Sequence, residues 1–330
     1  MIVTLTANPS LDRTVALDSV LRPGEVQQAV SVREDAGGKG VNVSRAIVAA
    51  GVPTLALVPL NPHDPYADLL RETGVPTRST AVAGRVRANI ALTDPAGTTT
   101  KINLPGARLT IADRRAAIAD TVAASRGARW LVLAGSVPPG VGDDFYADVI
   151  DAVREAPDAP LIAVDTSGAA LAVVVERSRP DLIKPNDAEL AQLAGLGGAL
   201  GGSGPDVADL VAEVVRVGAG LVPGSVGSAL VTLGSLGAVL LAEGGAWFAA
   251  PPSIRAVSTV GAGDSSLAGY VLAAVAGAGP AERLERAVRY GSAAASLPGT
   301  QIPTPADLPT GEVRAVALVA ERTTPAGIAP

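Results

Sequence analysis

A glycine-rich turn beside an aspartate is the strongest chemical signal in this sequence. An extended segment ends at Val260, Gly-Ala-Gly occupies 261–263, and Asp264 precedes a helix that we predict over 265–276. Glycine lets the main chain approach a ligand, and the free N–H groups at a helix N-terminus bind phosphate or a developing oxyanion. Asp264 could cap this helix, or it could act as a base beside the bound anion. The turn alone leaves both interpretations open.

A second glycine-rich stretch, Gly-Gly-Lys-Gly at 37–40, enters a helix that we predict to end near Ala50. It matches neither the Gly-x4-Gly-Lys-Ser/Thr pattern of P-loops nor the Gly-x-Gly-x-x-Gly pattern of dinucleotide-binding turns. Its glycines allow close approach of main chain to a ligand, Lys39 can meet a phosphate, and Asn42 projects from the first helical turn. Three glycines are more than a helix cap requires, so the pattern favours a binding role.

Polar side chains also follow two apolar strands. Asp12 follows the strand predicted over 1–7, and Lys184, Asn186 and Glu189 follow a second strand. Ligands bind at the carboxyl ends of the strands in open α/β sheets, so both places are candidate site positions. Asp12 is either a turn residue or an acceptor for substrate hydroxyls. Asn186 and Glu189 share a helix face, where they suit helix capping and a Mg²⁺-phosphate site equally.

A predicted hairpin of strands 84–93 and 98–104 carries cations on one face. Arg87 and Asn89 alternate onto this face, and Lys101 faces them from the second strand. The hairpin could therefore present positive charge to a single anion, and an ordinary solvated sheet face is the alternative.

The composition excludes several classes of protein. The net charge of −6 argues against a surface that coats nucleic acid, and a single histidine, His63, argues against a Ser-His-Asp triad or a multi-histidine metal site. The chain has no cysteine, which excludes disulfides and thiolate zinc sites and fits a cytoplasmic protein. Glycines and a proline interrupt the uncharged stretch 217–242, so we expect no membrane span, and we recognise no signal peptide. Only three of the 26 basic residues are lysines, which points to places where a compact ammonium group is needed.

Helices and apolar strands alternate from residue 111 onward, which predicts a parallel sheet covered on both faces. The predicted helices are 111–125, 143–154, 169–176, 206–217 and 284–296, and the strands between them include 130–134, 161–165, 229–233 and 238–242. Two strands near the N-terminus, 14–20 and 25–34, have no helix between them and are predicted to join the hairpin as a four-stranded lid. We predict a surface loop over 195–204 and a loose end over the last twenty residues.

Five motifs in this order resemble those of the ribokinase-like (PfkB) carbohydrate kinases, and within them the 1-phosphofructokinase and tagatose-6-phosphate kinase branch. The motifs are Asn8-Pro-Ser-Leu-Asp12, Gly37-Gly-Lys-Gly-Val-Asn42, Gly-Ser-Val-Pro-Pro-Gly140, Lys184-Pro-Asn-x-x-Glu189 and Thr259-Val-Gly-Ala-Gly-Asp-Ser265. The resemblance covers residues 1–305. It implies an α/β protein with a three-layer α/β/α ribokinase-like fold, a mostly parallel central sheet and a small β-sheet lid. It also implies a single kinase domain over 1–330, with a discontinuous lid formed by about 12–35 and 84–105.

The resemblance also implies a role for each motif residue, with ATP and Mg²⁺ as cofactors. The catalytic group is Asp264 as base, with an anion hole at Gly261, Ala262 and Gly263. The substrate-binding group is Asp12, Gly38, Lys39 and Asn42 for the sugar, and Arg87, Asn89 and Lys101 for its phosphate. The nucleotide and metal group is Lys184, Asn186, Glu189, Thr232, Gly234 and Gly237, of which Glu189 contacts Mg²⁺ through water.

Fructose 1-phosphate is the expected substrate, and fructose 1,6-bisphosphate the product. Tagatose 6-phosphate and fructose 6-phosphate are the alternatives, although Glu25 and Gln27 stand where some 6-phosphofructokinase relatives carry basic residues. The segment 59–65 replaces a Gly-x-x-Gly-x-Asp turn that many family members have. From another class, a non-catalytic sugar-phosphate sensor remains open. We expect a homodimer formed through the lid, with no nucleic-acid or membrane partner.

Overall fold

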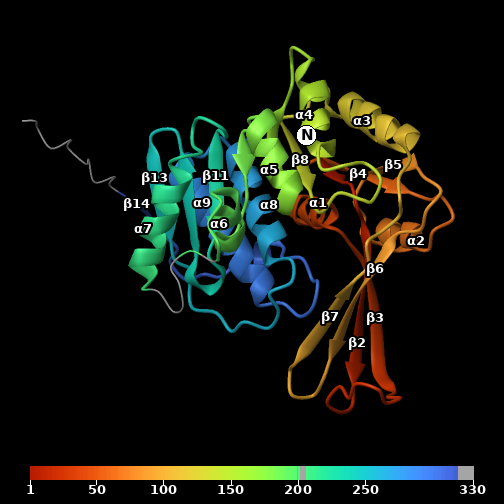
Figure 1. Ribbon diagram of the computed structural model, residues 1–330. Helices are drawn as coiled ribbons and strands as arrows, with labels where there is room; N and C mark the ends of the chain where they lie inside the picture. Colours follow the sequence, from red (N-terminus) through yellow and green to blue (C-terminus); the bar gives the residue numbers. More distant parts are fainter. Residues whose placement is uncertain (199, 201–205, 319–330) are drawn as a thin grey trace, which may run out of the picture.

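The computed structural model describes residues 1–198, 200 and 206–318, and these residues form two sheets (Figure 1). The large sheet has the strand order β14-β13-β12-β11-β10-β9-β8-β1-β4-β5, and the small one has the order β3-β2-β6-β7. Seven neighbouring strands of the large sheet are parallel, and the other three are antiparallel. The parallel strands are β5 (Thr77–Ala81), β4 (Thr54–Leu60), β1 (Ile2–Thr6), β8 (Trp130–Ala134), β9 (Leu161–Asp165), β10 (Leu182–Ile183) and β11 (Ser228–Thr232), and the antiparallel ones are β12 (Ala238–Ala242), β13 (Gly245–Ala249) and β14 (Ala315–Leu318).

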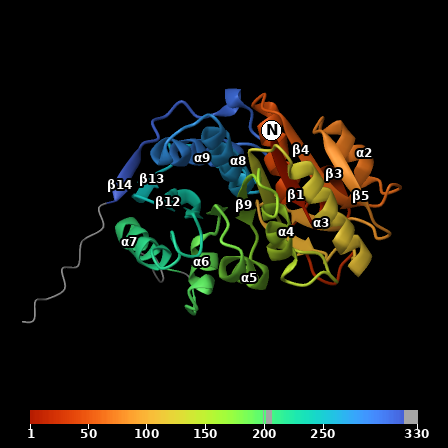
Figure 2. The same cartoon turned by 90° about the horizontal axis from the view of Figure 1, so that it is seen from above.

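Helices cover both faces of the large sheet. Seen from above, α8 and α9 lie on one side of the strands and α3 to α7 on the other (Figure 2). The first group, which also includes α1, comprises α1 (Lys39–Ala49), α8 (Ala262–Val275) and α9 (Pro280–Ala295). The second group comprises α3 (Ile111–Ser125), α4 (Phe145–Arg154), α5 (Gly168–Arg177), α6 (Asp187–Leu193) and α7 (Val207–Gly218). The predicted three-layer α/β/α arrangement is confirmed.

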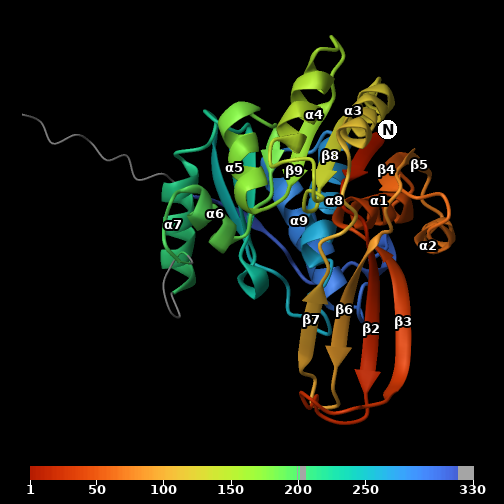
Figure 3. The ribbon, with the colours of Figure 1, turned by 45° about the vertical axis from the view of Figure 1, so that its right-hand side comes forward.

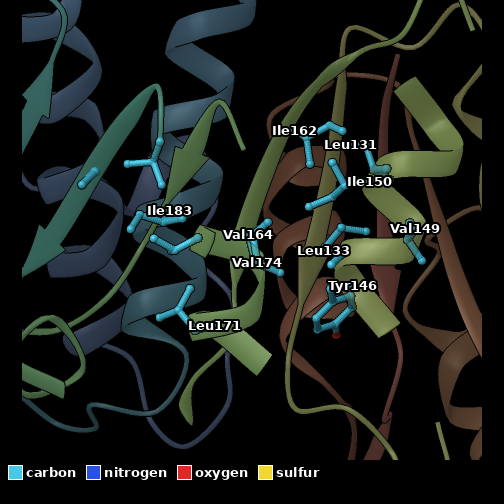
Figure 4. Close-up of a cluster of buried hydrophobic side chains, with 14 of the residues drawn as sticks. Leu131, Leu133, Tyr146, Val149, Ile150, Ile162, Val164, Leu171, Val174 and Ile183 are labelled. Atoms are coloured by element: carbon cyan, nitrogen blue, oxygen red, sulfur yellow. The ribbon is translucent and has the colours of Figure 1, made fainter. Parts of the chain in front are cut away.

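Alternation along the strands of the large sheet builds a hydrophobic core on each of its two faces. Leu131 and Leu133 of β8 point toward α3, α4 and α5, where they pack with Ile150 and Tyr146 (Figure 4). The alternate residue Val132 enters the core beneath α1, α8 and α9. Because successive side chains of a strand point to opposite faces, a strand between two helix layers must be apolar at every position. This is why these strands read as unbroken apolar runs in the sequence.

The small sheet projects from the side of the molecule at which β1 ends (Figures 1 and 3). It consists of β2 (Ser10–Leu17), β3 (Ala29–Gly37), β6 (Arg87–Thr93) and β7 (Thr99–Asn103). Asp12 is paired with Asp35 on β3 and with Asn89 on β6, and Asn89 is paired with Asn103 on β7. Paired residues on neighbouring strands share a face, so these four polar side chains lie on one face of the sheet.

The first two strands of the small sheet were predicted with the wrong ends. We expected strands over 14–20 and 25–34, but β2 ends at Leu17 and β3 begins only at Ala29. Gln27 explains the difference, because its side chain accepts a hydrogen bond from the Arg22 N–H and donates to the Val20 carbonyl. These bonds close a longer loop between the strands, and Gln27 faces that loop.

Two edge strands of the large sheet were not predicted. β5 lies at one edge, beside β4, and its sequence Thr-Arg-Ser-Thr-Ala lacks the apolar run of the inner strands. β14 lies at the other edge and pairs with β13, although we expected the last twenty residues to be loose. Residues 319–330, and 199 and 201–205 of the predicted surface loop, lie outside the described residues.

None of the helices in the described part of the chain combines the length and the apolar character that a bilayer crossing requires.

Candidate active site

The N-terminus of α8 forms the centre of the candidate site. Gly261 precedes the helix with a φ of 77°, a left-handed conformation that glycine adopts without strain. The helix begins at Ala262, so Ala262 and Gly263 belong to its first turn, and our prediction of a helix that starts only at 265 was wrong. The N-cap of this helix is Gly261, and Asp264 is the third residue of its first turn. The capping interpretation of Asp264 therefore fails, and the carboxylate has another partner.

That partner is Asn42 on α1, the helix that packs beside α8 (Figure 1). The Asn42 Nδ2 group donates a hydrogen bond of 2.9 Å to Asp264 Oδ2, and both residues are buried. Burial and the negative charge of Asp165 raise the pKa of Asp264 to about 6, outweighing the opposite effects of Lys39, the Asn42 hydrogen bond and Lys184. A carboxyl group with a pKa close to neutrality is suited to general base catalysis.

Asp165 at the end of β9 joins two of the three lysines. Its Oδ1 accepts a hydrogen bond of 2.8 Å from Lys39 Nζ, and its Oδ2 forms an ion pair of 3.3 Å with Lys184 Nζ. Burial alone would raise the pKa of Asp165, but Lys184 and Lys39 outweigh it and hold the pKa below its ordinary value. Our sequence analysis missed Asp165, although it ends an apolar strand at the same sheet edge as Lys184.

The ammonium group of Lys184 lies against the first turn of α8. A Cβ atom placed on Gly263 would be 3.2 Å from Lys184 Nζ, so glycine leaves room for the lysine. Lys39 approaches from α1, and although its partial burial would lower its pKa, Asp165 and Asp264 outweigh this and raise it. Two ammonium groups therefore meet near a helix N-terminus, an arrangement suited to binding phosphate.

The glycines at 37–40 pack α1 closely against its neighbours. A Cβ atom on Gly37 would overlap the Asp12 carboxylate, and one on Gly40 would collide with Thr6 at the end of β1. Gly38 is the N-cap of α1 with a φ of 118°, a left-handed conformation. The glycine-rich stretch thus brings Asp12 of the small sheet next to the N-terminus of α1, where Lys39 and Asn42 also lie.

Asp12 is held by its own strand and by β6. Its Oδ1 accepts hydrogen bonds from Ser10 Oγ at 2.8 Å and from Asn89 Nδ2 at 3.0 Å. Burial outweighs these bonds and raises the pKa of Asp12. Among the described residues both of these bonds go to Oδ1, so Oδ2 is available to accept a hydrogen bond from a ligand hydroxyl.

Arg87 lies at the base of the small sheet, where it is paired with Ser10. With Asn8, Asn103 and Ser136 it lines an open groove of about 550 Å³. The Arg87 Nε group is buried, and within the described part of the chain it has no hydrogen-bond partner. A buried donor without a partner is costly, which suits Arg87 to binding an anion in this groove.

Lys101, which we grouped with Arg87 and Asn89, lies apart from them. It is paired with Ala91, two pairs further along the sheet than Asn89 and Asn103, and its side chain is exposed. It does not line the groove that Arg87 lines. The structure therefore brings together Arg87 and Asn89 but leaves Lys101 toward the tip of the sheet.

Asn186 and Glu189 form a capping box at the start of α6. The Asn186 N–H donates to Glu189 Oε2 at 2.9 Å, and the Glu189 N–H donates to Asn186 Oδ1 at 2.7 Å. Thr232 lies beside them, because it forms a parallel bridge with Asn186. The η1 turn (Gly234–Leu236) then leads to Gly237, where a Cβ atom would overlap the Ala249 carbonyl. The capping interpretation is thus confirmed for Asn186 and Glu189, and their binding roles stay a prediction.

The same residues fit a magnesium ion held through water. No cluster of three acidic, histidine or cysteine side chains that could hold a metal occurs within residues 1–198, 200 and 206–318. Magnesium needs no such cluster, since it keeps several waters and binds one or two carboxylates together with substrate phosphates. The capping hydrogen bond uses only Oε2 of Glu189. The negative charge of Glu189 acts on Lys39, so the Glu189 side chain lies on the side of α6 that faces the candidate site.

The family model for pfkB family carbohydrate kinases matches residues 6–307. The chain belongs to this family. This pfkB family chain is 34% identical to a 1-phosphofructokinase of Rhodobacter capsulatus over 308 residues, which are 92% of this chain and 93% of the relative. It is also 32% identical to an ATP-dependent 6-phosphofructokinase isozyme 2 of Mycobacterium tuberculosis, over 91% of this chain and 85% of the relative.

A solved structure shares the fold of this pfkB family chain. The crystal structure of phosphofructokinase-2 from Escherichia coli in complex with substrates and products superposes with a TM-score of 0.81. The two proteins are 29% identical, and the match covers 93% of this chain and 96% of that one. The predicted resemblance to the ribokinase-like carbohydrate kinases is therefore confirmed, as is the expectation of an enzyme that transfers phosphate to a hydroxyl group.

Proposed function

We propose that this chain is a 1-phosphofructokinase that uses ATP and Mg²⁺ to convert fructose 1-phosphate into fructose 1,6-bisphosphate. The observation that carries the proposal is the buried Asp264 carboxylate at the N-terminus of α8, with its pKa raised to about 6 and with Lys184 at the same helix turn. A base and an anion-binding turn side by side are what phosphoryl transfer to a hydroxyl requires. The named relatives at 30–34% identity support this reaction class.

Asp264 takes the proton from the 6-hydroxyl of the sugar as this oxygen forms a bond to the γ-phosphorus of ATP. The bond from that phosphorus to the bridging oxygen breaks, and ADP leaves with the electron pair. The N–H groups of the first turn of α8, at Gly261, Ala262 and Gly263, stabilise the charge on the transferring group. Lys39 and Lys184 add compact positive charge next to this turn. Asn42 holds the carboxylate in place.

The sugar and its phosphate occupy the space between the small sheet and α1. Asp12, Gly38 and Asn42 contact the hydroxyl groups, and Arg87 binds the phosphate in the groove that it lines with Ser136. We assign Lys101 to phosphate binding only when the small sheet closes over the substrate. This sheet, at about 12–35 and 84–105, is the lid of a single kinase domain.

The nucleotide lies on the other side of Asp264. Asn186, Glu189, Thr232, Gly234 and Gly237 form this part of the site, and Lys184 reaches the phosphates. Bound Mg²⁺ would neutralise and orient the nucleotide phosphates, and Glu189 would hold it through a water molecule.

A 6-phosphofructokinase is the second candidate, because the Mycobacterium tuberculosis relative carries that name at 32% identity. Two residues in the loop between β2 and β3 of the lid, Glu25 and Gln27, argue against a 6-phosphofructokinase. Gln27 is occupied by loop hydrogen bonds, and Glu25 forms an ion pair of 2.7 Å with Arg22. Neither side chain offers a cation to a 6-phosphate. Tagatose 6-phosphate is the remaining sugar to test.

We also propose a cytoplasmic homodimer that forms through the lid. The face of the lid opposite Asp12 exposes apolar side chains, including Val32, which is 57% exposed, and Ile102, which is 49% exposed. Pairing of two such faces would bury them. Light scattering of the wild type and of Val32→Glu tests the assembly. A tetramer, the state of the inhibited form of phosphofructokinase-2 from Escherichia coli, is the alternative outcome.

The test of the proposed function is a coupled ADP-release assay with Mg-ATP. We expect kcat/KM for fructose 1-phosphate to exceed the values for fructose 6-phosphate and tagatose 6-phosphate. A preference for either of the other sugars would change the proposed substrate but leave the proposed kinase activity in place. Binding of the sugar phosphates without ADP release would instead favour the sensor.

A further inference from the structure

We infer that Asp165 is a positioning residue for phosphoryl transfer, whose carboxylate holds the ammonium groups of Lys39 and Lys184 beside Asp264 and the first turn of α8. This inference rests on the proposed function, because it gives the two lysines their task. No motif of the sequence analysis contained Asp165, which is separated in sequence from all three of its neighbours.

The geometry of Asp165 is that of a shared anchor. It ends β9 at the middle of the large sheet, and its side chain is completely buried, whereas the Lys184 side chain is 6% and that of Lys39 is 40% exposed. Each carboxylate oxygen pairs with a different lysine, at 2.8 Å and 3.3 Å. One lysine comes from α1 and the other from the end of β10, so a single carboxylate fixes the distance between two cations on separate elements.

A purely stabilising role explains this arrangement poorly. A buried ion pair typically contributes little net free energy to folding, because the cost of desolvating the two charges cancels much of their attraction. Asp165 also raises the pKa of Asp264, which means that its charge makes the ionised site less stable. A fold selected for stability alone gains nothing from a second buried carboxylate beside the first.

The charges around Asp264 explain what the arrangement does. Lys39 and Asn42 face it from α1, Lys184 from the end of β10 and Asp165 from β9, while Glu189 of α6 acts on Lys39. Two cations alone would depress the basicity of Asp264. The negative charge of Asp165 offsets them, so that the lysines can serve the phosphate while Asp264 still accepts a proton.

The variant Asp165→Asn tests the inference because it keeps the shape of the side chain and removes its charge. We expect kcat to fall by about 100-fold or more, while KM for the sugar phosphate changes by less than about threefold, since Asp12, Gly38 and Asn42 keep their contacts with the sugar hydroxyl groups. The acid limb of the pH profile of kcat/KM should move to lower pH by about one unit, because Asp264 loses a repelling neighbour. A residue that acts only on folding would not shift this limb.

Lysine NMR gives a readout that does not depend on turnover. The chain has only three lysines, at 39, 101 and 184, so protein labelled with ¹⁵N-lysine has three side-chain signals to assign. In Asp165→Asn the signals of Lys39 and Lys184 should shift, and that of Lys101, on the exposed strand β7, should not. Asp148→Asn is the matched control, because Asp148 also binds two cations, Arg114 and Arg177, but on the outer face of α4.

Two results would overturn the inference: a kcat within threefold of the wild type, or unmoved signals of Lys39 and Lys184. Wild-type turnover is measured first, and the comparison uses whichever sugar the wild type phosphorylates, so that a wrong substrate and a wrong role for Asp165 are told apart. If no sugar is phosphorylated, the lysine signals alone decide.

If Asp165→Asn fails to fold, the double variant Asp165→Asn/Lys184→Gln removes the buried pair together. Its acid limb should lie about one unit below that of Lys184→Gln, and equal limbs would count against Asp165.

Discussion

The side chain of Asn42 donates a hydrogen bond to Asp264, which lies 222 residues further along the sequence. This bond connects α1 to α8, the helix that carries the proposed base. The bond has two effects. It fixes the orientation of the carboxylate, and it lowers the pKa of Asp264 against the stronger influence of burial. The glycines around Lys39 make the bond possible, since they let α1 pack close to β1.

The first prediction concerns the proposed base. Asp264→Asn should lower kcat by about 10²–10⁴-fold, because the amide cannot accept the proton of the sugar hydroxyl. The amide oxygen can still accept the Asn42 hydrogen bond, so binding of fructose 1-phosphate, measured by calorimetry, should stay within about threefold of the wild type. A turnover number close to that of the wild type would exclude Asp264 as the base.

The second prediction concerns pH. Asp264 must be ionised to act as a base, and its pKa is raised to about 6. The value of kcat/KM should therefore be constant well above pH 6 and fall about tenfold per pH unit below it. Initial rates between pH 5 and pH 9 in buffers of constant ionic strength would reveal the limb, and a profile that is flat down to pH 5 would contradict the assignment.

The third prediction links the same group to stability. A carboxyl whose pKa is higher in the folded state than in the unfolded state stabilises the fold at low pH, and this contribution is lost as the pH rises through about 6. The Asp264→Asn variant has no carboxyl group at this position, so its stability does not fall in this way as the pH rises. The free energy of unfolding of the variant relative to the wild type should therefore increase by about 1 kcal/mol between pH 5 and pH 8. Urea unfolding at both values measures it, and an equal difference at both would argue against the raised pKa.

The sequence was sufficient for the elements that carry a local signal. β8 and β9 were predicted with their observed ends, because each is an unbroken apolar run between a helix and a polar residue. The turn at Gly261 and the capping box at Asn186 also follow from local residue types. The edge strand β14 was missed, because an edge strand is held by main-chain pairing and needs little apolar pattern.

The sequence was not sufficient for relationships that depend on topology and register. Nothing local marks Asp165 as the partner of Lys39 and Lys184, since their contact arises only when β9 lies between β8 and β10. Lys101 shows the converse. Its alternation with Asn103 suggested a place beside Arg87, and only the pairing of β6 with β7 reveals how far along the sheet it lies.

The fourth prediction separates the two roles of Glu189. Glu189→Gln keeps the capping box, because glutamine at this position also accepts the hydrogen bond from the Asn186 N–H. It removes the charge that would act on magnesium, so the Mg²⁺ concentration for half-maximal rate should rise about tenfold while the thermal midpoint stays unchanged. Glu189→Ala should show the same magnesium effect together with a loss of about 1 kcal/mol of stability. An unchanged magnesium dependence in both variants would leave Glu189 as a cap alone.

The fifth prediction concerns the contact between Gly37 and Asp12. The backbone of Gly37 does not have a positive φ, so alanine is compatible with its conformation, but the added Cβ would overlap the Asp12 carboxylate. Asp12 must then turn away from the sugar site. Gly37→Ala should raise KM for the sugar phosphate by about tenfold or more with a smaller effect on kcat, because a substrate contact is lost while Asp264 is untouched.

Gly279→Ala is the matched control for Gly37→Ala. Gly279 precedes α9 with a φ of −74°, and a Cβ atom there would meet no heavy atom within 4 Å. Its kinetic constants should equal those of the wild type, so that any change in Gly37→Ala can be attributed to the displaced carboxylate. A KM for Gly37→Ala that matches the control would show that Asp12 tolerates the displacement or does not bind the sugar. A crystal structure of the variant then distinguishes these two cases by the position of the Asp12 side chain.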